Sequence, residues 1–413
     1  MRGDERGSGE RPALARLLAI SPQTFAAEYW AERPLFTRAN ELPRTFGDLF
    51  SAGAVDELVT RRALRTPFVR MATEGSVLNA ARFTAPGGFG AEIADQVSAD
   101  KVLDEFAAGA TLVLQGLHRT WAPLAEYTRQ LVADLGHPAQ VNAYITPASA
   151  SGFDPHYDVH DVFVIQIAGE KRWRIHAPVH PNPLRDQPWD EHRAAVARQA
   201  QNTPEIEETF RPGDVLYLPR GWIHSATALG GTSIHLTIGV AALTRHDVLK
   251  EVLAAAAQNE GLRAALPLGV DFTDPAVVSA LVADAVDDLA RFSRDDPDQA
   301  GQVAGRLARR VRNSTRPEPI APLATIEGAA ALHEATTVSL RHGLDARIGD
   351  AADGQVALVL PGKTVTLPAE AGRALDAVLV GETIRAGDLP GLDSASSLVV
   401  ARRLVREGVL VVR

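Results

Sequence analysis

Three residues, His156, Asp158 and His224, have the side chains needed to hold a transition metal through nitrogen and oxygen atoms. Two imidazoles and one carboxylate on one face of an octahedral ion leave the opposite positions open, as in non-haem Fe(II) oxygenases. His156 and Asp158 are two residues apart, so on a β-strand both side chains point to the same face. The third ligand, His224, must then come from a strand that lies beside the first in space.

The residues that precede His224 strengthen the metal-site interpretation. Residues 213–224 follow the pattern G-x5-P-x-G-x2-H, which resembles the second metal motif of the cupin β-barrel. Gly213 predicts a tight turn before a short apolar strand, and Pro219 and Gly221 then end this strand and turn the chain. The alternative is that His156 and His224 are ordinary polar residues of a β-rich protein, and the paired motif favours the metal site over it.

A metal held by three protein ligands keeps three coordination positions, enough for a bidentate 2-oxoacid and O2. A dicarboxylate such as 2-oxoglutarate also needs a cation for its distal carboxylate, and Lys171 is the candidate. The pattern predicts that residues 168–171 form the turn of a hairpin between strands at 162–167 and 172–176. On spacing alone, a solvated turn lysine is the better interpretation of Lys171.

Composition excludes several classes of site and partner. The chain has 413 residues, of which 46% are hydrophobic and 23% charged, as in a soluble protein of two or three domains. It has no cysteine, so disulfides, thiolate metal sites and cysteine nucleophiles are excluded. Residues 1–18 are charged and lack the apolar core of a signal peptide, and no segment resembles a membrane span, so we expect a cytoplasmic protein without membrane contact. The net charge of -9 argues against broad nucleic-acid binding and suits a basic partner.

The hydrophobic pattern changes twice along the chain. Residues 141–241 are β-rich, with strands expected at 141–146, 162–167, 172–176, 215–218 and 233–240. Residues 245–320 are Ala-rich with helical spacing, and residues 312–322 contain three prolines that predict a linker. From about residue 331 onward, the pattern predicts a small unit that contains both strands and helices.

Several segments together are similar to the ribosomal oxygenase branch of the JmjC/cupin 2-oxoglutarate oxygenases. They are residues 142–147, 155–158, 162–166, 169–174, 212–224 and 235–237. The resemblance implies an α+β chain with a double-stranded β-helix (cupin/JmjC jelly-roll) core, in a catalytic domain of residues 1–244 that begins with helical elements. It also implies a helical dimerisation domain at 245–322, a winged-helix-like domain at 323–413, and therefore a homodimer.

The same resemblance implies the ligands and the residues that bind them. Fe(II) would be held by the metal triad, 2-oxoglutarate and O2 would be co-substrates, and Lys171 would bind 2-oxoglutarate. Asn142, Tyr144 and Thr237 correspond to positions that line the co-substrate pocket, although each can equally be a polar strand residue bonded within the barrel. His235 can belong either to the surroundings of the metal or to the core.

Two segments near the triad depart from the family pattern. Residues 148–154 differ from the usual Gly-rich segment, and residues 159–161 follow the ligands where relatives vary. These segments border the substrate cleft, so the amino acid that is modified cannot be transferred from the family. His160 can face the substrate or the metal ligands, although a surface histidine is the default interpretation.

Members of this family hydroxylate an Arg or His side chain of a ribosomal protein, so we expect a protein or peptide substrate, most simply a basic ribosomal protein. Residues 189–191 and 205–208 would give the cleft an acidic rim, although an acidic loop is more often solvated surface. The C-terminal region has a single arginine cluster, at 402–406, and no basic stripe, which favours protein interaction over DNA binding. Two alternatives stay open: the same chemistry on a biosynthetic precursor peptide or N-methyl-lysine, and a non-enzymatic metal-binding cupin that acts as a regulator.

Overall fold

The computed structural model describes residues 11–73, 75–90, 92–148, 154–349 and 354–413. Residues 1–10 of the charged N-terminal segment, and residues 149–153 of the segment that departs from the family pattern, lie outside the described residues. The chain divides into two compact units, Met1–Ala242 and Leu243–Arg413. Within the described ranges, no helix combines the length and the apolar character that crossing a membrane requires.

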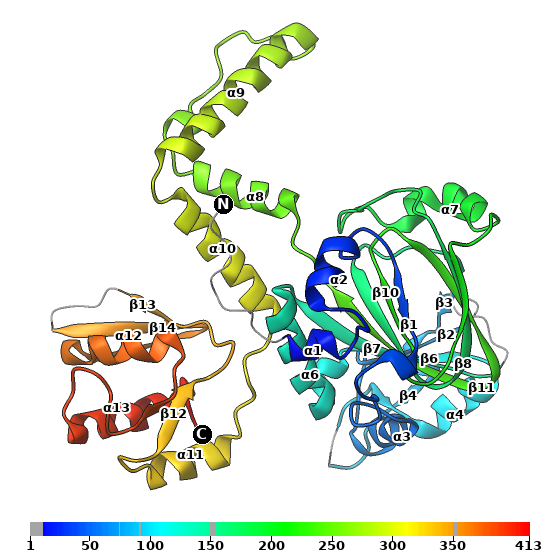
Figure 1. The fold of residues 1–413 in the computed structure, drawn as a ribbon, viewed down its shortest axis with the longest axis horizontal. Coiled ribbons are helices and arrows are strands. Elements are labelled where there is room, and N and C mark those ends of the chain that lie inside the picture. Colours follow the sequence, from blue (N-terminus) through cyan, green and yellow to red (C-terminus); the bar gives the residue numbers. More distant parts are fainter. Residues whose placement is uncertain (1–10, 74, 91, 149–153, 350–353) are drawn as a thin grey trace. The chain divides into compact units, whose positions relative to one another are not determined.

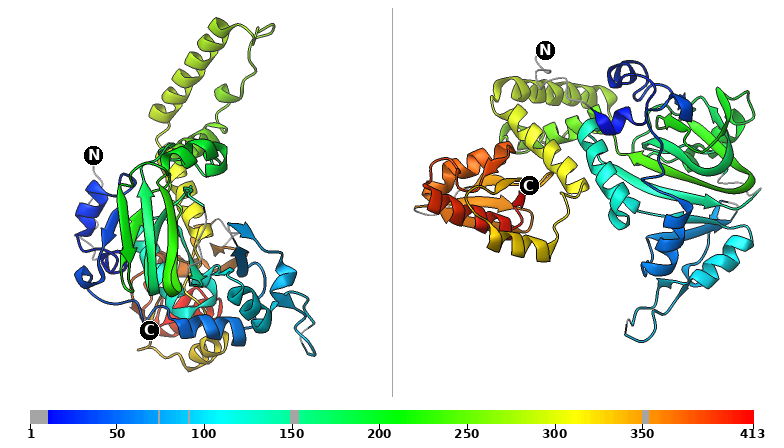
Figure 2. Two further views of the ribbon diagram at one scale, coloured as in Figure 1. Left: turned by 90° about the vertical axis from the view of Figure 1, so that its right-hand side faces the viewer. Right: turned by 60° about the horizontal axis from the view of Figure 1, so that its bottom comes forward.

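The first unit is built around a nine-stranded sheet in which every pairing is antiparallel (Figures 1 and 2). Hydrogen-bonded neighbours follow the order β1-β10-β8-β11-β7-β6-β2-β3, and β9 pairs with β8. The strands are β1 (Leu35–Thr37), β2 (Val69–Thr73), β3 (Ser76–Val77), β6 (Thr111–Leu114), β7 (Ala139–Thr146), β8 (Asp161–His176), β9 (Ile206–Phe210), β10 (Val215–Leu218) and β11 (Ile223–Val240). Two short strands, β4 (Thr84–Ala85) and β5 (Gln96–Val97), pair separately.

The long strands β8 and β11 connect the two halves of this sheet. The first half of β8 pairs with β10 and with the end of β11, whereas its second half pairs with β9 and with the start of β11. Alternate side chains divide between two cores, as the two-residue period of a strand requires. One set packs inside the barrel, for example Val164 and Trp173, and the other packs outside it, for example Phe163 and Ile165. A large antiparallel sheet of this kind is consistent with the expected cupin core.

The prediction of a hairpin turn at residues 168–171 is wrong. β8 continues from Asp161 to His176 without reversing its direction. The chain bulges instead, because the register with β11 shifts on both sides of Ile234 and Gly169 has a φ of 63°. Glycine adopts this conformation at little steric cost, so the residues that suggested a turn produce a bulge within one strand. Lys171 therefore lies inside a strand.

Helices pack against the outer face of the sheet and at its ends (Figure 1). The helix α6 (Ala122–Leu135) ends at Gly136, which has the left-handed conformation that glycine favours. The α-helices of this unit are α1 (Pro12–Ala15), α2 (Pro22–Glu28), α3 (Ala52–Arg61), α4 (Ala99–Ala107), α5 (Leu117–Thr120), α6 (Ala122–Leu135) and α7 (Arg193–Gln199). The 3-10 helices are η1 (Ala39–Glu41), η2 (Ala80–Arg82) and η3 (Trp189–His192).

The second unit starts with helices and continues as a mixed α+β region, as the pattern predicts. Its helices are α8 (Arg245–Ala256), η4 (Gly261–Arg263), α9 (Pro275–Asp295), α10 (Gln299–Ser314), α11 (Pro322–Ala331), η5 (Ala369–Ala371), α12 (Gly372–Val380) and α13 (Ser394–Arg406). One three-stranded sheet has the order β16 (Ile384–Arg385), β12 (Thr337–Leu340) and β17 (Leu410–Val412). The other has the order β13 (Arg347–Gly349), β14 (Gln355–Leu360) and β15 (Lys363–Pro368). The division into three domains and the winged-helix and dimerisation assignments stay predictions.

Candidate active site

The structure brings His156, Asp158 and His224 together. Each offers one ligand atom, and these three atoms lie within 4.8 Å of one another. The two imidazole centroids are 4.4 Å apart, and His224 Nε2 lies 3.9 Å from a carboxylate oxygen of Asp158. Ligand atoms about 2.1 Å from one ion are somewhat closer together than this, so small side-chain movements suffice to close the group on a metal.

Backbone pairing places the two histidines side by side. His156 N donates to His224 O at 3.2 Å, and His224 N donates to His156 O at 2.8 Å, which forms an isolated antiparallel bridge. His224 lies at the start of β11, as expected for a ligand that opens the neighbouring strand. The strand expected at His156 and Asp158 is wrong, because the bridge to His224 is the only β-pairing of the described residues 154–160. Tyr157, between the two ligands, is nevertheless buried with Val196 and Ile223 in a separate cluster.

Both histidines are oriented by backbone carbonyls. His156 Nδ1 lies 2.6 Å from Asp154 O, and His224 Nδ1 lies 3.2 Å from Trp222 O. Since a carbonyl oxygen only accepts, each Nδ1 is the donor, and Nε2 is the nitrogen left to bind a metal. Metal-ligating histidines are commonly held in this way through the nitrogen that does not face the metal. This observation shows that the two histidines fit a metal.

The electrostatics of the triad also suit a cation. Burial lowers the pKa of His224 to about 4, so that this imidazole is neutral and available as a ligand at neutral pH. Burial opposes ionisation of Asp158, but electrostatic interaction with His160, His224 and His156 outweighs it and lowers the pKa of Asp158. His224 therefore offers a neutral nitrogen ligand, and Asp158 offers an anionic oxygen ligand.

A cavity of about 260 Å³ opens beside the triad. It has apolar walls from Val162, Val164, Trp173 and Ala226, and the triad forms part of its lining. The remaining lining residues are polar: Arg70, Thr111, Tyr144, Thr146, Lys171, Ser225, His235 and Thr237. Most of the lining side chains are therefore polar or charged, and groups of this kind fix the orientation of a small polar ligand.

Lys171 reaches into this cavity from β8. It is only 3% exposed, and its Nζ donates to Thr146 Oγ1 at 3.2 Å. Burial lowers the pKa of Lys171 to about 8. Within the part of the chain that the structure describes, no carboxylate forms an ion pair with Lys171. A buried ammonium without a carboxylate partner is unfavourable, and an anionic ligand in the cavity would offset that cost. The solvated-turn interpretation of Lys171 is wrong.

Comparison with known protein families identifies the segment that contains the triad and Lys171. Residues 120–248 match a family model described as the JmjC domain. The chain contains a JmjC domain and is related to the ribosomal oxygenases. It is 31% identical over 213 residues to the bifunctional lysine-specific demethylase and histidyl-hydroxylase NO66 of Drosophila pseudoobscura pseudoobscura, covering 47% of this chain and 22% of the relative. It is 30% identical over 247 residues to ribosomal oxygenase 1 of Gallus gallus, covering 58% of this chain and 38% of the relative. The matches thus span less than half the length of these relatives.

The fold is also shared with a solved structure. Ribosomal oxygenase YcfD of Escherichia coli, in complex with cobalt and 2-oxoglutarate, gives a TM-score of 0.52 at 17% identity, over 96% of this chain and 99% of that one. At this identity the likeness concerns the fold alone. Together with the JmjC match, it confirms the family resemblance that the sequence motifs carry.

The other residues that were expected to line the co-substrate pocket do not all lie at the cavity. Tyr144 and Thr237 line the cavity, in neighbouring strands β7 and β11. The amide oxygen of Asn142 instead accepts a hydrogen bond from Gly116 N at 3.1 Å, and Asn142 is not among the residues that line the cavity. His235 is 4% exposed and stacks on Tyr144 with centroids 5.0 Å apart, so it belongs to the cavity wall.

Sequence reasoning missed several residues of the cavity. Thr146 could have been found, because it follows Asn142 and Tyr144 at the two-residue spacing of one strand face. Arg70 could not, because its place in the cavity depends on the pairing of β2 with β6 and of β6 with β7. Burial and the charge of Asp158 raise the pKa of Tyr144, while a hydrogen bond with Arg70 acts in the opposite direction.

The two acidic segments expected to form the rim of the cleft have different surroundings in the structure. Trp189 lies next to the triad, with its ring centroid 6.1 Å from that of His156, and the neighbouring Asp190 is exposed. Glu207 and Glu208 belong to β9, where they form ion pairs with Arg174 and Arg38. Near Trp189, the guanidinium of Arg193 lies 4.5 Å from the centroid of the indole ring, so this segment carries charges of both signs.

Proposed function

We propose that this protein is an Fe(II)- and 2-oxoglutarate-dependent oxygenase that hydroxylates a side chain of a protein, most simply of a ribosomal protein. The observation that carries the proposal is the convergence of His156, Asp158 and His224 beside a cavity that contains the buried cation Lys171. Two histidines with their Nδ1 atoms bonded to carbonyls, together with one carboxylate, form the donor set of such enzymes.

Each residue has a role that follows from its position. His156, Asp158 and His224 would hold Fe(II), and Lys171, supported by Thr146, would bind the distal carboxylate of 2-oxoglutarate. When bound, Fe(II) with 2-oxoglutarate supplies the chemistry that inserts one atom of O2 into a C–H bond, while 2-oxoglutarate loses CO2 and becomes succinate. Val164 and Trp173 would give the reacting groups an apolar boundary.

The charge of the cavity favours a histidyl over an arginyl target. Two cations, Lys171 and Arg70, line the cavity against one carboxylate, Asp158. A divalent cation and a dianionic co-substrate would cancel each other, so the occupied site stays positively charged. A neutral imidazole enters such a site more readily than a guanidinium does. The NO66 relative, whose name includes histidyl-hydroxylase, points in the same direction.

The test is a turnover assay with candidate substrates. Purified protein is incubated with Fe(II), 2-oxoglutarate and either intact ribosomal proteins or peptides that carry a His or an Arg. We expect succinate and a mass gain of about 16 Da, the mass of one oxygen atom, on a His-containing peptide. The His224→Ala variant is the matched control, and absence of 2-oxoglutarate turnover with every substrate would argue against the proposal.

Demethylation of N-methyl-lysine is the second candidate, because the NO66 relative is also named a lysine-specific demethylase. Hydroxylation of an N-methyl carbon would release formaldehyde, whereas hydroxylation of a ring or chain carbon leaves the oxygen on the product. Assaying methylated peptides for formaldehyde separates the two reactions. A biosynthetic precursor peptide would give the same mass gain as a ribosomal protein, so both kinds of peptide belong in the assay.

We also propose that the second unit mediates self-association and protein contacts. The helices α8 and α9 expose large apolar side chains, among them Leu253, Val282 and Val286. Exposed apolar residues of this size commonly mark an interaction surface, and a homodimer is the simplest partner. In α13, Arg402 donates to Leu332 O and Arg403 pairs with Glu407, which argues against a free basic surface for DNA. Light scattering on the intact protein tests the dimer.

A further inference from the structure

The direction of Lys171 depends on the bulge in β8. Before the bulge, Val162 and Val164 face the cavity, and after it Lys171 and Trp173 do. Inward residues therefore have even numbers before the bulge and odd numbers after it. Ile167 and Ala168, which are consecutive, both pack against the outer core, which marks the point where the alternation changes. A regular strand would turn Lys171 away from the cavity.

Gln166 holds this bulge from the inside. Its side chain is fully buried, and its Nε2 lies within hydrogen-bond distance of three acceptors: Ala168 O at 2.9 Å, Gly169 O at 3.1 Å and Ser233 Oγ at 2.8 Å. Two of these acceptors are backbone carbonyls of the bulge, and Ser233 belongs to the facing strand β11. One amide group thus connects the irregular backbone of β8 to its neighbour.

The backbone of Gln166 is itself fixed. Gln166 N donates to Asp214 O at 3.0 Å, and its carbonyl accepts from Gly213 N at 2.8 Å. On the other side of the bulge, the fit against β11 is tight, because a Cβ at Gly169 would lie 2.2 Å from Thr232 O. The bulge therefore has an anchored residue before it and a close backbone contact at its centre.

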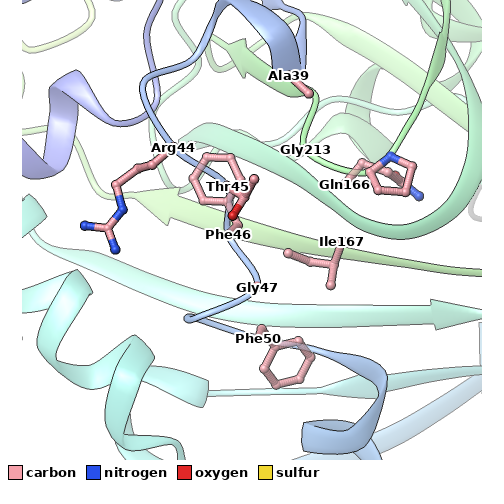
Figure 3. A pocket seen from close by; sticks show the side chains of 10 residues that line it. Ala39, Arg44, Thr45, Phe46, Gly47, Phe50, Gln166, Ile167 and Gly213 are labelled. Atoms are coloured by element: carbon pink, nitrogen blue, oxygen red, sulfur yellow. The ribbon is translucent and has the colours of Figure 1, made fainter.

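The packing beside Ile167 leaves a space. A second cavity, of about 140 Å³, is lined by Gln166 and Ile167 together with Phe46 and Phe50 (Figure 3). With this space beside it, the backbone at Ile167 has room to move unless hydrogen bonds restrain it. The side-chain amide of Gln166 supplies these hydrogen bonds.

We infer that Gln166 is a positioning residue that fixes the β8 bulge and thereby points Lys171 into the cavity for the distal carboxylate of 2-oxoglutarate. The inference rests on the proposed function for the role of Lys171. Gln166 itself is not required to touch the co-substrate. Replacing Gln166 should therefore weaken 2-oxoglutarate binding only when Lys171 is present.

A double-mutant cycle tests this dependence. Gln166→Met keeps the length of the side chain and removes its donors, and Ile165→Val is the matched control on the outward face of the same strand. Calorimetry measures 2-oxoglutarate binding to the full-length, Mn(II)-loaded proteins, and thermal unfolding confirms that each variant is folded. We expect Gln166→Met to weaken binding about tenfold, Lys171→Ala about a hundredfold, and the double variant no more than Lys171→Ala. Binding by Gln166→Met at the wild-type affinity, or an additive loss in the double variant, would overturn the inference.

A second measurement needs neither metal nor co-substrate. An amine-reactive reagent modifies exposed lysines, so mass spectrometry reports the modification of Lys171 relative to the exposed Lys250. We expect Gln166→Met to raise the modification of Lys171 several-fold and Ile165→Val to leave it unchanged. Equal protection of Lys171 in both variants would overturn the inference. Wild-type protein that binds no 2-oxoglutarate would overturn the proposed function instead, and the labelling result would then decide on Gln166.

Discussion

His156 and His224 exchange two backbone hydrogen bonds, of 3.2 and 2.8 Å, although they lie far apart in sequence and His156 lies outside the named strands. Main-chain pairing thus fixes the separation of two metal ligands before any metal binds. The third ligand, Asp158, follows two residues after His156, so its direction is set by the same short segment. The donor set is therefore pre-organised, and the loss of one ligand leaves the other two in place.

Replacing His224 by Ala should abolish iron-dependent turnover, because two remaining ligands hold Fe(II) poorly. The variant should still fold, since the backbone pairing with His156 does not use the imidazole. Succinate production measures activity, and calorimetric Fe(II) or Mn(II) binding measures retention of the metal. A variant that keeps its activity would remove His224 from the triad.

Replacing Lys171 by Ala should chiefly raise the 2-oxoglutarate concentration needed for half-maximal rate. A charge-assisted contact of about 2–3 kcal/mol corresponds to a 30- to 150-fold change. The maximal rate should change less, because Lys171 is not a metal ligand. Kinetics at increasing 2-oxoglutarate concentrations check this split, and an unchanged requirement would assign Lys171 a purely structural role.

The pH dependence of co-substrate binding has a predictable sign. Only the protonated ammonium attracts a carboxylate, and burial lowers the pKa of Lys171 from 10.5 to about 8 in the free protein. Affinity for 2-oxoglutarate should thus be constant below about pH 8 and fall roughly tenfold per unit above it. The free energy of unfolding should move the other way and rise between about pH 8 and 10.5, because deprotonation relieves the buried charge. Titration calorimetry measures the affinity, and scanning calorimetry measures the stability, at several pH values in this range. The Lys171→Ala variant, which lacks the titrating ammonium, is the control for both.

Gly239→Ala should destabilise the first unit through His160. An added Cβ at this position would lie 2.6 Å from Cδ2 of the His160 ring. His160 is two residues from Asp158, so displacement of its ring disturbs the metal-binding segment, at an expected loss of about 1–3 kcal/mol. Removing the ring should relieve the clash, so the variant with both Gly239→Ala and His160→Ala should unfold at a higher temperature than Gly239→Ala alone. Equal unfolding temperatures would exclude this contact as the cause.

Arg70→Gln should reduce the preference for His-containing over Arg-containing peptides. The substitution removes one of the two cations of the cavity while keeping a hydrogen-bond donor near Tyr144. We expect the ratio of kcat/KM between the two peptides to fall by about tenfold, which corresponds to about 1.4 kcal/mol. An unchanged ratio would show that Arg70 does not select the target.

Local patterns were sufficient to predict the triad and most of the strands. His156 and Asp158 needed only the two-residue period of a strand, and His224 needed only a motif of twelve residues. The direction of Lys171 was not predictable from local sequence, because residues 168–171 have the composition of a turn and the bulge forms only against β11. The contribution of Arg70 was equally hidden, since it depends on pairing between strands that are far apart in sequence.

The long strands β8 and β11 limit where related chains can gain or lose residues. Each carries inward-facing residues of both ends of the cavity: Lys171 follows the bulge of β8, and His224 and His235 lie along β11. Inserting or deleting a single residue in either strand would invert every side chain beyond that point. Homologues should therefore differ here by substitution and keep constant the number of residues between Val162 and Lys171 in β8, and between His224 and His235 in β11, while length changes accumulate in the connecting loops.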